Sequence, residues 1–144
     1  MTRSLLHWKW VLGFWISSCV MTMQVVAGDG GCPPGCTCLS PDGADGLSVQ
    51  CMHASSVPSS WPADTTNIEI GFVKTPKNGI PPGAFANLLK VKSISLRGSL
   101  GTLHTSAFYN LTGLTKSTSE LNFWDCSIDS VQMSAFNQIS RFNI

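Results

Sequence analysis

Four cysteines near the start of the chain carry its most specific chemistry. Cys32, Cys36 and Cys38 stand in the run Cys-Pro-Pro-Gly-Cys-Thr-Cys, and Cys51 follows after a turn-rich segment. Closely spaced cysteines of this kind are typical of a disulfide framework formed in an oxidising compartment. A metal site is not expected, because the spacing lacks the two paired Cys-x-x-Cys knuckles of structural zinc. The residue types therefore predict disulfides but leave their pairing open.

An apolar leader precedes the cysteines and predicts secretion. Residues 1–27 begin with the basic residues Arg3 and Lys9, continue as an uncharged apolar stretch and end in small residues, so we expect cleavage after Ala27. The alternative is a retained signal anchor, since residues 10–27 approach the length that spans a bilayer. Polar side chains within this stretch favour cleavage, and we expect a secreted or extracellular protein.

The charge balance argues against nucleic acid as a partner. The whole chain has nine Lys and Arg against eight Asp and Glu. Cleavage removes Arg3 and Lys9 but no acid, so seven basic residues face eight acids and the mature chain carries about −1. A basic footprint is missing, and binding to nucleic acid is not expected.

Three phenylalanines mark a repeating unit. Phe85, Phe108 and Phe136 occupy the related phrases Gly-Ala-Phe-Ala-Asn-Leu, Ser-Ala-Phe-Tyr-Asn-Leu and Ser-Ala-Phe-Asn-Gln-Ile. After Phe85, apolar residues recur with the spacing L-x-x-L-x-x-L-x-L, which is that of a leucine-rich repeat. Its final L-x-L predicts a short strand with alternate residues in the core. Corresponding strands are expected within 67–72 and at 121–123.

Two of these repeats are irregular. In the first, either Ile68 and Ile70 or Ile70 and Phe72 could form the inward pair. In the third, the segment 115–120 contains extra positions before the strand. The existence of the strands is therefore predicted more firmly than their register.

The cysteine cluster resembles the N-terminal cap of extracellular leucine-rich repeat proteins, and the remainder resembles their repeats. Modules of this kind occur in Slit proteins, Nogo-type receptors, Toll-like receptors, small proteoglycans and variable lymphocyte receptors. The segment from Ser56 to Phe85 is similar to their junction between cap and first repeat. The resemblance implies an α/β-type repeat solenoid, a short horseshoe of about three repeats with a disulfide-stapled β cap. It also implies the pairs Cys32–Cys38 and Cys36–Cys51.

This reading divides the chain into four segments. A signal peptide (1–27) and a flexible start (28–31) precede the cysteine-rich cap (32–66), and the repeats occupy 67–144. The repeats reach the last residue without a C-terminal cysteine cap. We therefore expect a truncated product of a longer protein, or a homodimer that hides the open end. A membrane connection is expected only through a missing C-terminal region or an uncleaved leader.

The chain departs from the family pattern at the positions that usually form an asparagine ladder. Thr75, Ser99 and Cys126 stand near those positions. Cys126 has no obvious partner, so we expect a buried free thiol. An intermolecular disulfide is the alternative.

The resemblance implies that a ligand binds to the concave strand face. The strand residues that alternate with the core there include Arg97 and Trp124, which are residue types that often anchor interfaces. The alternative is that Trp124 only packs on an irregular repeat. The predicted ligand-binding residues are Glu69, Ser95, Arg97, Asn122 and Trp124. The sequon Asn110-Leu111-Thr112 predicts a glycan on the convex or flanking side, away from that face.

Catalysis is not expected. Beyond the leader, His53 and His104 are the only histidines, and no nucleophile elbow or glycine-rich phosphate loop surrounds a reactive residue. No cofactor is predicted.

The leading hypothesis is an extracellular protein-binding module, either a receptor ectodomain or a secreted fragment of one. One alternative is a structural matrix component similar to small leucine-rich proteoglycans. A small disulfide-rich enzyme or inhibitor is a less favoured reading, as is a shortened gene model with a misassigned exon boundary.

Overall fold

The computed structural model describes residues 31–40, 45–115, 118–137 and 139. The predicted signal peptide at 1–27 and all but the last residue of the predicted start at 28–31 lie outside these ranges. Within them, no helix has the length and apolar character needed to cross a membrane.

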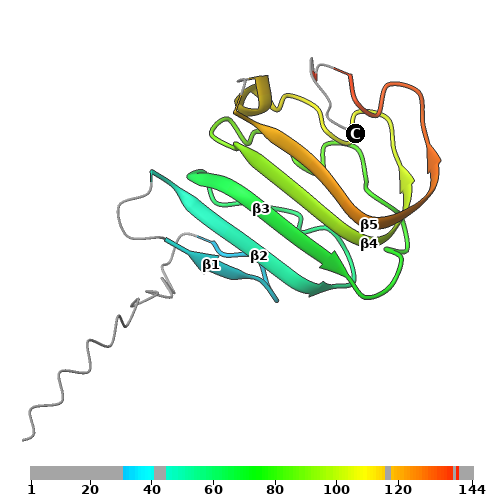
Figure 1. Ribbon diagram of the computed structural model, residues 1–144, viewed down its shortest axis with the longest axis horizontal. Coiled ribbons are helices and arrows are strands. Elements are labelled where there is room, and N and C mark those ends of the chain that lie inside the picture. Colours follow the sequence, from blue (N-terminus) through cyan, green and yellow to red (C-terminus); the bar gives the residue numbers. More distant parts are fainter. Residues whose placement is uncertain (1–30, 41–44, 116–117, 138, 140–144) are drawn as a thin grey trace, which may run out of the picture.

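One mixed sheet of five strands organises this part of the chain (Figure 1). Its strands lie in sequence order, β1-β2-β3-β4-β5, with β1 antiparallel to β2 and the other neighbours parallel. The bounds are β1 Thr37–Leu39, β2 Leu47–Ala54, β3 Thr65–Phe72, β4 Ser93–Leu103 and β5 Glu120–Val131. The described residues contain no α-helix, only the short 3-10 helix η1 at Thr112–Thr115. The described residues thus form a mostly parallel sheet. The α/β-type repeat solenoid that the sequence predicts is a more specific architecture, and it stays a prediction.

The register of the parallel strands follows the apolar spacing. Ile68 of β3 is the partner of Ile94 in β4, which is the partner of Leu121 in β5. The next inward position carries Ile70 and Leu96, both fully buried. The residues of β3 that share the inward rows of Ile94 and Leu96 are therefore Ile68 and Ile70, which answers the question that the sequence left open.

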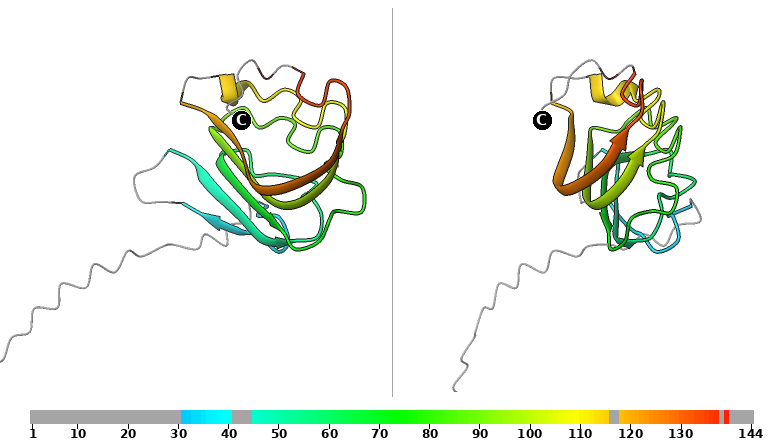
Figure 2. Two further views of the ribbon diagram at one scale, coloured as in Figure 1. Left: turned by 45° about the vertical axis from the view of Figure 1, so that its right-hand side comes forward. Right: turned by 90° about the vertical axis from the view of Figure 1, so that its right-hand side faces the viewer.

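β4 and β5 are longer than the expected three-residue strands because they continue through a bend (Figure 2). At the bend, Gly98 has φ 91° and Asp125 has φ 48°, and the register between the strands shifts just there. A Cβ on Gly98 would lie 2.4 Å from the carbonyl oxygen of Phe72. The bend therefore requires glycine for its conformation and for the close approach of β3.

Replacing Gly98 by alanine should lower the free energy of unfolding by about 3 kcal/mol, because left-handed strain adds to a backbone clash. Gly83→Ala is the matched control: Gly83 also has a positive φ, but its added Cβ would meet nothing closer than 3.7 Å. This control should cost about 1 kcal/mol. Urea unfolding of both variants measures the difference, and equal losses would show that β3 is not held against Gly98.

A stack of aromatic rings fills the core opposite the strands. The ring centroids of Trp61 and Phe85 lie 5.7 Å apart, and those of Phe85 and Phe108 lie 5.3 Å apart. Phe136 continues the stack at 5.3 Å from Phe108. The three related phrases therefore place their phenylalanines in one column. Trp61, which the sequence did not single out, begins the column and donates its indole N–H to the carbonyl oxygen of Ala84 at 2.9 Å.

Two disulfides hold the N-terminal edge of the sheet. They join Cys32 to Cys38 and Cys36 to Cys51, which is the pairing that the resemblance implied. Cys38 and Cys51 are buried in the core. The Cys36–Cys51 disulfide joins the residue just before β1 to β2, and the Cys32–Cys38 disulfide ties the preceding segment to β1. Together they fasten the short antiparallel strand and its N-terminal segment to the sheet.

Candidate functional site

The five predicted ligand-binding residues lie on one face of the sheet, in two adjacent cross-strand rows. Glu69, Ser95 and Asn122 are register partners across β3, β4 and β5. Arg97 and Trp124 are partners in the next row. These residues alternate with buried ones along each strand, so their side chains point away from the core.

Arg97 and Trp124 are the two exposed residues among these five. Trp124 exposes 60% of its surface and Arg97 is also exposed. Within the part of the chain that the structure describes, the only salt bridge joins Lys90 to Asp64, so Arg97 has no ionic partner there. Gly71 precedes Arg97 in the same row and contributes no side chain on that flank. An unpaired guanidinium thus lies beside an exposed indole.

The other row is more enclosed and already has internal contacts. Glu69, Ser95 and Asn122 are half-buried. The Asn122 side chain donates a hydrogen bond to the Glu120 carboxylate, with 3.1 Å between Nδ2 and Oε2. These groups offer polar contacts around the Arg97 and Trp124 pair.

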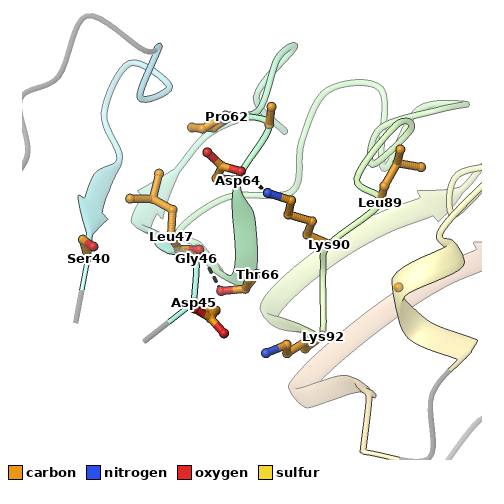
Figure 3. A pocket seen from close by; sticks show the side chains of 12 residues that line it. Ser40, Asp45, Gly46, Leu47, Pro62, Asp64, Thr66, Leu89, Lys90 and Lys92 are labelled. Carbon is orange, nitrogen blue, oxygen red and sulfur yellow. Dashed lines mark hydrogen bonds and ion pairs between the residues drawn. The ribbon is translucent and has the colours of Figure 1, made fainter. Parts of the chain in front are cut away.

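A cavity of about 880 Å³ lies elsewhere on the molecule, and the sequence did not predict it (Figure 3). It lies where β2 and β3 begin, and its walls include Leu47, Thr66 and Leu89. Lys90 reaches across it to form an ion pair with Asp64. Its lining comes from segments far apart in the chain, which explains why no local motif marks it. Lys90 is already paired, and Lys92 lines the cavity without an aromatic side chain among the lining residues. The Arg97 face, where a guanidinium lies beside an exposed indole, is therefore the stronger candidate.

Cys126 is a free thiol beside this face. It is half-buried, and its Sγ lies 3.0 Å from the carbonyl oxygen of Leu96, to which it can donate a hydrogen bond. Burial raises the pKa of the Cys126 thiol, opposed by a backbone hydrogen bond at Gly98. The thiol therefore acts as a neutral hydrogen-bond donor to the strand backbone, where the expected asparagine ladder is interrupted.

The raised pKa predicts how Cys126 responds to pH. At neutral pH the thiol should stay protonated and react more slowly with iodoacetamide than a free cysteine. The folded protein favours the protonated form, so stability is fully present below the ordinary thiol pKa and declines as pH rises toward the raised value. Alkylation rates measured by mass spectrometry, with urea unfolding across the same pH range, test this. Cys126→Ser should abolish that pH dependence, and an alkylation midpoint below that of free cysteine would contradict the prediction.

The remaining candidates lie apart from the Arg97 face. His53 is exposed near the end of β2, and His104 is half-buried in the segment after β4. Throughout the described ranges, no group of three or more His, Cys, Asp or Glu side chains could hold a metal ion. Asn110 lies in the turn after Phe108, outside the strands, and has φ 59°.

Comparison with protein-family models and with curated proteins found no match to this chain. The residues themselves must therefore carry any inference about function.

Proposed function

We propose that this chain is an extracellular protein-binding module that recognises a protein ligand on the exposed strand face. In this proposal the fold is a short leucine-rich repeat horseshoe with a disulfide-stapled cap, and its role is recognition without catalysis. The parallel strands in register and the column of repeat phenylalanines support the repeat architecture. The two disulfides support an oxidising environment, in agreement with secretion.

The observation that carries the proposal is the pairing of Arg97 with Trp124. Both side chains are exposed, they are cross-strand partners, and Arg97 lacks an ionic partner among the residues described. Arginine and tryptophan anchor interfaces because each buries a large surface and also forms directed polar or π contacts. A ligand carboxylate can pair with Arg97 while an apolar group packs on Trp124.

The test is a selection of binders followed by substitution of the face. A displayed library of extracellular protein fragments is selected on the immobilised secreted protein, and bound clones are measured against variants. Trp124→Ala and Arg97→Ala should each weaken most clones by about thirty-fold, which corresponds to about 2 kcal/mol. Val73→Ala removes an equally exposed apolar side chain just beyond the end of β3 and should leave binding unchanged. If most clones bind both the Trp124→Ala and the Arg97→Ala variants with unchanged affinity, the proposal is refuted.

A further inference from the structure

The two edges of the sheet differ in their exposure to a further strand. β1 forms one edge with three residues and is fastened by disulfides. β5 forms the other edge with 12 residues, and no strand in the described part of the chain pairs with its outer side (Figure 1). A long edge strand presents a row of unpaired backbone N–H and C=O groups, which is a template for another strand.

Apolar side chains along β5 are uncovered where their neighbours in β4 are buried. Val131 exposes 52% of its surface, whereas its register partner Leu103 is fully buried. Ile128 exposes 38%, and Met133, just beyond the strand, exposes 90%. The layer formed by β4 is therefore covered by β5, but the equivalent layer of β5 still exposes apolar surface.

The charges on β5 indicate what kind of strand can pair with it. Glu120, Asp125 and Asp129 are exposed, and the strand contains no Lys, Arg or His. Pairing with β5 of a second copy would bring two sets of acids together on adjacent strands, which is unfavourable. A strand with basic side chains would instead gain opposite-charge pairs.

We propose that the outer edge of β5 binds an extended segment of a partner protein in which basic side chains alternate with apolar ones. Backbone hydrogen bonds would attach the segment as a sixth strand, and alternate side chains would provide specificity. Its apolar side chains cover Ile128, while the basic side chains that alternate with them lie beside Asp129. This site uses the outer backbone edge of β5, so it adjoins the recognition face, which includes Asn122 and Trp124 of the same strand.

Two synthetic peptides test the proposal with the full secreted protein. One alternates valine with lysine over about the length of β5, and the other has glutamate in place of each lysine. In fluorescence anisotropy, the lysine peptide should bind at least about tenfold more tightly, with a preference that falls as salt rises. On binding, hydrogen exchange should slow in residues 120–131. Equal affinities, or slowed exchange only outside β5, would overturn the proposal.

Substitution of Asp129 distinguishes recognition of charge from nonspecific binding of the peptides. Asp129→Lys should shift the preference toward the glutamate peptide, and Asp129→Asn should reduce the original preference without reversing it. Val73→Ala, at an exposed position beyond the end of β3, should leave peptide binding within twofold. Clones selected on the recognition face should bind the Asp129 variants as they bind the parent protein, so a loss at that face is distinguishable from a loss at the edge. Analytical ultracentrifugation of the protein alone measures its oligomeric state as the last part of the test. A dimer that protects the β5 amides without any peptide would overturn the proposal and identify a second copy as the occupant.

Discussion

Replacing Phe108 by alanine should lower the free energy of unfolding by about 3–5 kcal/mol, which is the largest single effect that we expect in this chain. Phe108 is fully buried in the middle of the aromatic column, 5.3 Å from both Phe85 and Phe136. The Phe123 ring packs nearly perpendicular to it, with 6.3 Å between the ring centroids. Truncation would leave a cavity bounded by rigid rings on both sides, and such a site relaxes poorly.

Urea unfolding followed by tryptophan fluorescence measures this effect, since Trp61 ends the same column. Tyr109→Ala is the adjacent control, because Tyr109 exposes 47% of its surface and should cost well under 1 kcal/mol. Phe108→Leu should recover part of the loss by filling the cavity. A loss below about 1 kcal/mol for Phe108→Ala would mean that the column does not hold the layers together.

The second large effect is expected from the disulfide between Cys36 and Cys51. Its cysteines are separated by 15 residues, against 6 for Cys32 and Cys38. Closing the longer loop restricts the unfolded chain more, so replacing both Cys36 and Cys51 by alanine should cost about 3 kcal/mol. The Cys32→Ala and Cys38→Ala pair is the matched control and should cost about 2 kcal/mol.

Urea midpoints of the two double variants, measured under non-reducing conditions, compare the disulfides directly. Hydrogen exchange should show where the loss falls: without Cys36–Cys51, protection should decrease first in β1, which has only β2 as a neighbour. A larger loss from the Cys32–Cys38 pair would contradict the loop-entropy explanation. It would indicate that local packing around the buried Cys38 determines cap stability.

Much of the sheet was predictable because its signal is local. Alternation placed Ile94 and Leu96 in the core, and the repeated phrases identified Phe85 and Phe108 as equivalent. Both pairs are fully buried as that pattern indicates. A strand lying on a core needs only a period of two to bury one side, so nearest neighbours in the sequence carry this information.

The candidate site was also predictable in part. Glu69, Ser95 and Asn122 are outward residues of successive strands, so correct register brings them into one row. That Arg97 has no ionic partner among the described residues was not predictable, because such a partner can come from any distant segment. The cavity beside Lys90 was not predictable either, because its lining residues come from distant segments that meet only in the folded protein.

By itself, the sequence determined where β3, β4 and β5 begin, the inward residues of β4 and the cysteine chemistry, because spacing along the chain encodes each of them. Tertiary structure alone decided three further features. It chose Ile68 and Ile70 over Ile70 and Phe72 through pairing with β4. It continued β4 and β5 through the bend at Gly98 and Asp125, where positive φ angles interrupt the alternation that sequence reading relies on. It also placed Trp61 on Phe85, a contact between residues whose types and local spacing give no sign of it. Each of these three features depends on which distant segment of the chain packs beside it, and that is determined only in the folded protein.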